Sequence, residues 1–149
     1  MKTYVPVAIL FAGLFLISIT NSSCSKITDS SGVPKEQLII GHWNINRVQL
    51  RLYYSGVFAK DTILKQTPMP ENYVSFAAGG NFEYRFNKPT ADVGTYQFVG
   101  TDSVISNVTS KVYKWKMLTL TDVLFTVMNT STDPAYPGAT VETYQTFVK

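Results

Sequence analysis

The stretch GHWNINRVQLRLYY, residues 41–54, decides the fold. Its apolar side chains alternate with period two, which is the pattern of a half-buried β-strand. The alternation starts with Trp43 and Ile45 and then changes phase to Val48 and every second residue after it, so one core can hold both halves only if the strand bulges near residues 46–47. Long strands that bend around a closed sheet use such bulges. The stretch therefore predicts a long, bent strand in a strongly curved sheet.

The chain after residue 54 continues in short alternating segments separated by turn residues. The clearest pair is 73–77 with 82–86, joined through Gly79 and Gly80, which can take the positive φ of a tight connection. Only residues 35–40 (KEQLII) favour a helix, of one or two turns, placed to plug one end of a barrel. The segments are nearly all sequence neighbours, which predicts an all-β fold, an up-and-down antiparallel β-barrel of about eight strands. A β-sandwich is the alternative, although the Cys…Trp…Cys spacing of immunoglobulin domains is missing.

The amino-acid composition excludes several classes of function. The 149 residues are 45% hydrophobic and 15% charged, which is typical of one compact domain. One cysteine and one histidine supply too few ligands for most zinc sites and too few partners for a Ser-His or Cys-His nucleophile. The basic residues stand singly along the chain, without the phosphate-neutralising stripe of a nucleic-acid-binding protein. We therefore expect no enzymatic activity, no cofactor, no metal and no nucleic-acid partner.

The N-terminus has the pattern of an export signal. Lys2 precedes residues 5–19, which carry no charge, and this stretch is shorter than the about 20 apolar residues that a spanning helix needs. It suits the core of a signal peptide, and we predict that residues 1–23 are one. Residues 24–35 are rich in serine, with Gly32 and Pro34, and they predict a flexible tether ahead of the folded domain at 36–149.

The small polar residues after the apolar stretch end at Cys24, the only cysteine of the chain. Ser23-Cys24 in this place resembles the lipobox of bacterial lipoproteins, in which the cysteine is acylated and becomes the new N-terminus. The resemblance implies that acylated Cys24 binds a lipid membrane and that the protein lies in the bacterial cell envelope, at the outer membrane. An ordinary secreted protein with a spare thiol and an uncleaved membrane anchor are the alternatives.

Gly41-His42-Trp43 after a short helical segment resembles the Gly-x-Trp signature that opens lipocalins and their calycin relatives. The order of the later segments, with SFAAGGNF at residues 75–82, Gly94-Thr95-Tyr96 and a final FVK, resembles the lipocalin-like domains of short bacterial lipoproteins. The resemblance implies an eight-stranded barrel whose closed end is covered by the tryptophan of the motif beside a basic residue from the far end of the chain. Gly41, Trp43 and Lys149 would take these places.

A lipocalin-like barrel implies a binding protein rather than a catalyst. The aromatic side chains at alternate strand positions either line a cavity or simply fill a small barrel. The candidates for a cavity are Tyr84, Phe86, Tyr96, Phe98, Tyr113, Trp115, Phe125 and Tyr144. A lined cavity predicts a small hydrophobic or amphipathic ligand. A filled barrel predicts instead a structural or accessory envelope lipoprotein that binds a protein or glycan through its loops, notably 65–72 and 130–139.

Overall fold

The computed structural model describes residues 32–66 and 71–149, so the predicted signal peptide, Cys24 and most of the predicted tether lie outside the described residues. Within these described ranges one short helix, α1 (Lys35–Leu38), precedes the strands. No helix among the described residues has both the length and the apolar character to cross a membrane. The part of the chain that the structure describes then forms nine strands: β1 (Gly41–Tyr54), β2 (Val57–Ile63), β3 (Tyr73–Phe76), β4 (Asn81–Arg85), β5 (Asp92–Val99), β6 (Ser103–Val108), β7 (Lys111–Leu120), β8 (Leu124–Ser131) and β9 (Ala139–Val148).

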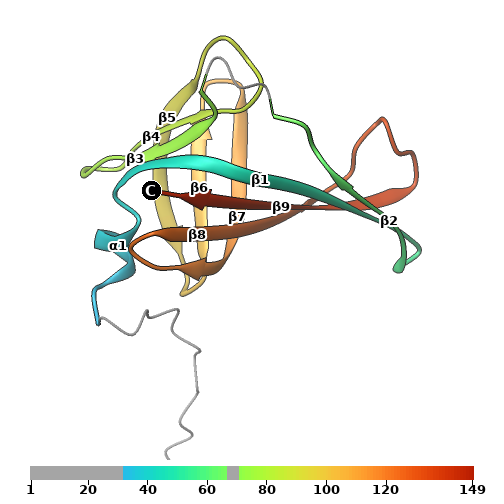
Figure 1. Cartoon of the computed structure of the whole chain (residues 1–149), viewed down its shortest axis with the longest axis horizontal. Helices are drawn as coiled ribbons and strands as arrows, with labels where there is room; N and C mark the ends of the chain where they lie inside the picture. Colours follow the sequence, from blue (N-terminus) through green and yellow to red (C-terminus); the bar gives the residue numbers. More distant parts are fainter. Residues whose placement is uncertain (1–31, 67–70) are drawn as a thin grey trace, which may run out of the picture.

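The strands form one antiparallel sheet that closes on itself (Figure 1). From β3 to β9 each strand pairs with the next, β3 also pairs with the first residues of β1, and β9 pairs with β1 along most of its length. Eight strands therefore make a closed barrel without an open edge between the first and last strands. The expected eight-stranded up-and-down β-barrel is confirmed, and the sandwich alternative is not what the chain forms.

The predicted bulge in β1 is present. Against β9, Ile45 pairs with Phe147 and Arg47 pairs with Thr146, so Asn46 has no partner in that register. The extra residue turns the following half of the strand over, and Ile45 and Val48 are both buried in the same core although they differ in phase.

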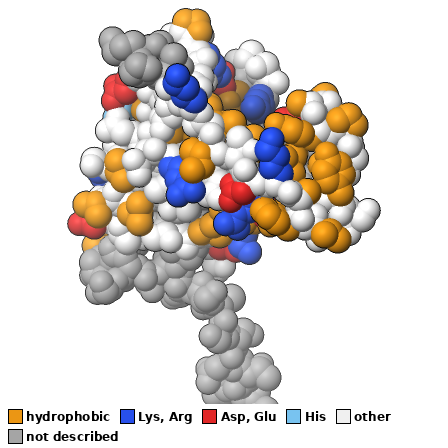
Figure 2. Space-filling view, turned by 45° about the vertical axis from the view of Figure 1, so that its right-hand side comes forward, with side chains coloured by type: hydrophobic (Ala, Val, Ile, Leu, Met, Phe, Trp, Pro, Cys, Tyr) orange, Lys and Arg blue, Asp and Glu red, His pale blue; other side chains and the backbone are white. Residues whose placement is uncertain are grey.

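The second strand, β2, is not part of the closed barrel. β2 pairs only with Gln49 to Tyr54, the outer half of β1, and the start of β9 pairs on the other side of that half. These three segments form a projecting ribbon that extends away from the barrel (Figure 1). The ribbon has its own small core of Leu52, Ala139 and Val141. Figure 2 shows hydrophobic side chains gathered on this part of the surface. Val57, Phe58 and Ile63 of β2 are exposed.

The closed end of the barrel is covered by the segment around α1. Leu38 and Ile39 are buried in the main core, and the indole Nε1 of fully buried Trp43 donates to the Ile39 carbonyl at 2.7 Å. The Lys149 ammonium lies 4.2 Å from the centre of the Trp43 ring and donates to the Leu38 carbonyl at 3.2 Å. Gly41 leaves room for this lysine, because a Cβ there would lie 3.1 Å from Lys149 Cε. Gly41, Trp43 and Lys149, to which the resemblance gives a place at the closed end, thus lie together in the structure.

Lys35, the first residue of α1, contacts the β5–β6 turn. Its ammonium donates to the carbonyls of Gly100 and Thr101, at 2.9 and 3.0 Å, and lies 4.8 Å from the centre of the Phe98 ring. These contacts hold α1 against the β5–β6 turn.

Candidate functional site

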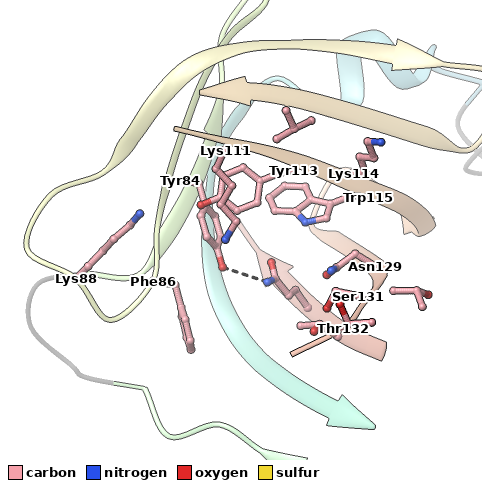
Figure 3. A pocket seen from close by; sticks show the side chains of 14 residues that line it. Tyr84, Phe86, Lys88, Lys111, Tyr113, Lys114, Trp115, Asn129, Ser131 and Thr132 are labelled. Atoms are coloured by element: carbon pink, nitrogen blue, oxygen red, sulfur yellow. Dashed lines mark hydrogen bonds between the residues drawn. The ribbon is translucent and has the colours of Figure 1, made fainter. Parts of the chain in front are cut away.

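The end of the barrel opposite α1 carries a pocket of about 660 Å³. It lies where β4 ends, β7 begins and the last residues of β8 approach the start of β9 (Figure 3). We call it the mouth pocket, and it is lined by Tyr84, Phe86, Lys88, Lys111, Val112, Tyr113, Lys114, Trp115, Asn129, Thr130, Ser131, Thr132, Thr143 and Gln145.

Three aromatic rings form the floor of the mouth pocket (Figure 3). Tyr84, Tyr113 and Trp115 are buried, with the Tyr84 ring centre 5.0 Å from that of Tyr113 and 5.5 Å from that of Trp115. Their inclined packing is the arrangement that aromatic rings prefer. Beneath them Phe82 and Phe147 are fully buried. The barrel is thus packed below this level and open above it.

A buried amide lies beside this aromatic floor. Gln145 Nε2 donates to the Tyr84 hydroxyl at 3.1 Å, drawn as the dashed line in Figure 3. Burial raises the pKa of Tyr84 far above its ordinary value, so this phenol stays protonated. Gln145 is only 7% exposed, and its Oε1 has no hydrogen-bond partner among the residues that the structure describes. A residue of the pocket wall therefore carries a buried hydrogen-bond acceptor that has no partner within the described part of the chain.

An ion-paired carboxylate fixes the other side of the floor. Asp92 accepts a hydrogen bond from the Tyr113 hydroxyl and forms an ion pair with Lys88. Burial alone would raise the pKa of Asp92, but the hydrogen bonds from Lys88 and Tyr113 and the charges of Lys88 and Lys111 outweigh it and lower that pKa. Burial, followed by the hydrogen bond to the carboxylate, raises the pKa of Tyr113. Tyr113 is thus held in one orientation as a neutral phenol.

The barrel wall is incomplete beside the mouth pocket. β7 pairs with β8 only through residues Lys116 to Leu120, so the first half of β7 and the last residues of β8 do not pair with each other. A second hollow of about 390 Å³ shares Lys114, Trp115, Asn129 and Thr130 with the mouth pocket. The two hollows therefore adjoin each other at this gap.

The structure divides the eight predicted cavity residues. Tyr84, Phe86, Tyr113 and Trp115 line the mouth pocket. The other four do not line it. Three of these four lie at or near the closed end of the barrel, away from the mouth pocket. Phe125 is fully buried at the closed end, 5.7 Å from Trp43 between ring centres, while Tyr96 and Phe98 are partly buried near that end. Phe125 is part of the core, and Tyr96 and Phe98 pack against it.

Tyr144 lies on the outer face of the barrel. Its ring centre is 4.8 Å from the guanidinium carbon of Arg51, and its hydroxyl donates to Glu142 at 2.9 Å. Gln145 and Phe147 face inward, so a residue next to Gln145 in an unbroken strand must face outward. The alternation of Val141, Gln145 and Phe147 was the sequence signal that could have placed Tyr144 outside and Gln145 inside.

The polar part of the pocket was not predicted from the sequence. Lys88 lies between β4 and β5, whereas Lys111 and Lys114 lie on β7, and only the fold brings these two segments to one rim. Asn129, Ser131 and Thr132 lie across the pocket from the aromatic rings (Figure 3). No signal in the sequence alone pointed to either group.

We expect alkaline pH to destabilise the fold through Tyr84 and Tyr113. Because burial raises the pKa of both phenols, the folded chain keeps protons that the unfolded chain loses above its ordinary tyrosine pKa of about 10. Their contribution to stability is complete below that pH and falls as the pH rises above it. Urea unfolding at a series of pH values measures the decrease, and it should be smaller in a Tyr84→Phe/Tyr113→Phe variant. An equal decrease in both proteins would contradict the assignment.

The described residues contain no cluster of three or more His, Cys, Asp or Glu side chains placed to hold a metal ion. Fold and site together define a small closed β-barrel with a polar-rimmed, aromatic-floored pocket at one end. No protein-family model matches the chain, and no curated protein matches it.

Proposed function

We propose that this chain is an exported, membrane-anchored lipoprotein of lipocalin-like type that binds a small hydrophobic or amphipathic ligand and catalyses no reaction. The mouth pocket is the observation that carries the proposal. Its volume of about 660 Å³ falls in the range of small-molecule sites, and it combines an aromatic floor with a few polar groups, as such sites do. The proximity of Trp43 and Lys149 at the closed end supports the lipocalin-like part of the proposal.

Binding is tested with N-phenylnaphthylamine, a neutral probe that fluoresces in apolar surroundings. We expect saturable binding of about one probe per protein, because burial of the probe on the aromatic floor removes apolar surface from water. Ser131→Trp should abolish it by filling the pocket from the rim, whereas Thr95→Trp, on the exposed side of β5, should leave it unchanged. Absence of binding by the unaltered protein would refute the proposal, as would equal binding by the Ser131→Trp variant.

The membrane anchor is tested by replacing Cys24 with serine and fractionating the producing cells. We expect the unaltered protein in the membrane fraction and the Cys24→Ser protein out of it, because several acyl chains together give stable attachment and no other anchor is proposed. A Cys24→Ser protein that stays wholly in the membrane would contradict lipidation at this residue. Mass spectrometry of the purified protein supplies an independent measurement of the acylated N-terminus.

A second candidate function is that of an accessory lipoprotein that binds a protein partner. The exposed apolar side chains of the projecting ribbon favour it, since Val57 and Ile63 are 69% and 60% exposed. The probe experiment separates the two candidates, because this one requires no ligand in the mouth pocket.

A further inference from the structure

The outer end of the projecting ribbon carries large apolar side chains on both of its faces. We call residues 53–58, the adjoining ends of β1 and β2 with the turn between them, the ribbon tip. Tyr54 pairs with Val57, so these two side chains share one face. Tyr53 pairs with Phe58 on the opposite face, with 5.8 Å between their ring centres. Val57, Phe58 and Tyr54 are 69%, 54% and 46% exposed.

The turn of the ribbon tip is tight. Ser55 and Gly56 both have positive φ, 51° and 79°, which is the geometry of a two-residue type I′ hairpin turn. The loop that precedes Ala139 lies beside the tip, because Ala139 pairs with Tyr54, and its one charged residue is Asp133. The end of the ribbon is therefore almost free of charge.

The charges of β1 and β2 begin at one level below the ribbon tip. Residues 52–59 carry no charge, and the first charged residues beside them are Arg51 and Lys60. Arg51 pairs with Asp61 across the two strands, with 3.7 Å between the Nε and Oδ2 atoms. Above this level the strands rise about 10 Å, at roughly 3.3 Å per residue. Amphipathic elements bury their apolar side about 5 to 10 Å deep in a membrane interface, so the uncharged length fits this layer.

The edge of β2 is poorly suited to pairing with a strand of another chain. Ala59 has no partner in the register with β1 and forms a bulge, and Lys60 follows it. Bulges and edge lysines both hinder the addition of a strand. A protein packed against one face of the ribbon tip would leave the other face in water, whereas lipid surrounds an inserted tip on both faces. These features favour a membrane over a protein partner.

The free edge of β2 also limits how deep the ribbon tip can lie. Within the described ranges β2 pairs only with β1. Backbone groups on its outer edge need water or lipid headgroups as partners, because unpaired N–H and C=O groups are costly in hydrocarbon. The tip therefore suits the interface and not the hydrocarbon core.

We propose that the ribbon tip inserts into the interface of the membrane that holds the acylated chain. This inference rests on the proposed membrane anchor. Residues 24–34 span up to about 35 Å when extended, so the domain can lie lengthwise on that membrane. Its α1 end and its ribbon lie at opposite ends of the molecule (Figure 1). A few side chains give only weak contact, so the tip orients the domain and does not replace the anchor.

Insertion is tested by tryptophan fluorescence of the full-length protein reconstituted into phosphatidylcholine vesicles that contain brominated phosphatidylcholine. The bromine atoms lie on the acyl chains and quench a tryptophan that reaches them. Trp43 and Trp115 are buried in the barrel, so the unaltered protein supplies the background. Phe58→Trp should lose about half of its added emission because the tip lies at the acyl boundary. Thr95→Trp, on β5 across the barrel from β1 and β9, should lose none.

A matched pair of charged variants tests the uncharged length. Val57 and Ile63 are exposed residues of the same strand, one within the ribbon tip and one below the charged level. In the Phe58→Trp protein, Val57→Asp should abolish the quenching because a carboxylate is costly to insert. Ile63→Asp should preserve it. Because both positions are exposed, neither change should unfold the protein.

The outcomes separate this inference from the proposed anchor. If the protein floats with the vesicles but Phe58→Trp is quenched no more than Thr95→Trp, the inserted tip is overturned and the anchor stands. Equal quenching in the Val57→Asp and Ile63→Asp proteins also overturns it. A blue shift of the Phe58→Trp emission that grows with protein concentration without vesicles would identify a second copy as the occupant instead. Quenching only by brominated lipid in separate, protein-free vesicles would overturn contact with the anchoring membrane. If the protein does not float with vesicles at all, the anchor and the inserted tip have both failed.

Discussion

Replacement of Trp43 by alanine is expected to lower the free energy of unfolding by about 3 to 5 kcal/mol, the usual cost of truncating a buried tryptophan. The indole is fully buried, and its ring centre lies 5.7 Å from that of Phe125. Alanine would leave a cavity at the closed end, remove the hydrogen bond to Ile39 and remove the ring under the Lys149 ammonium. Small domains have a free energy of unfolding of only about 5 to 15 kcal/mol, so this single change removes a large part of it.

The midpoint of urea unfolding measures the effect. Trp43→Phe should cost less, about 1 to 3 kcal/mol, because an aromatic ring remains but the Ile39 carbonyl loses its donor. His42→Ala is the matched control, one residue away on the exposed face of β1, and it should change stability by less than about 0.5 kcal/mol. Equal losses at positions 42 and 43 would show that Trp43 does not anchor the closed end.

Gly94→Ala is expected to have the second largest effect, about 3 kcal/mol, at the upper end of the usual range for overpacking. A Cβ at this position would lie 1.9 Å from the Asn107 carbonyl oxygen and 2.9 Å from Val108 Cα. Both are backbone atoms of the neighbouring strand β6, so no side-chain rotation relieves the clash and the β5–β6 pairing itself must shift. The requirement comes from close approach of two strands rather than from an unusual φ.

Thermal unfolding of the Gly94→Ala protein, followed by circular dichroism, checks this expectation. Thr95→Ala is the control, because Thr95 is the next residue on the same strand and is exposed. The control should unfold close to the temperature of the unaltered protein. A Gly94→Ala protein as stable as the control would mean that β5 and β6 separate at little cost.

Period and turn chemistry were enough to predict the barrel. The change of phase between Ile45 and Val48 predicted a bulge, and the register places it at Asn46. The projecting ribbon could not be predicted in this way, because it depends on how many residues of β1 extend beyond the other barrel strands. β2 has apolar side chains like any barrel strand, yet nearly all of its residues are exposed. Which strand pairs with the outer half of β1 is a tertiary outcome that no local pattern encodes.

The sequence predicted the inward-facing aromatic residues of the candidate site but not their position along the barrel. Alternation tells which face of a strand a residue occupies, and it correctly sent Tyr84, Tyr113 and Trp115 inward. It carries no information about height along the barrel axis, and Phe125 therefore lies at the closed end while Tyr113 lies at the mouth. The lysines that line the pocket come from two segments, Lys88 from the connection between β4 and β5 and Lys111 and Lys114 from β7, which meet at one end of the barrel. That grouping exists only after the sheet has closed.

The closure of the barrel by its first and last strands has a kinetic consequence. Asn44 pairs with Val148 and Tyr54 with Ala139, so this seam joins segments from the two ends of the domain. The hairpins from β5 to β7 connect sequence neighbours and can form early, whereas the seam must await β9 and a large loss of chain entropy. Refolding is expected to be slow for a domain of this size, with the amide protons of β1 and β9 among the last to gain protection from exchange.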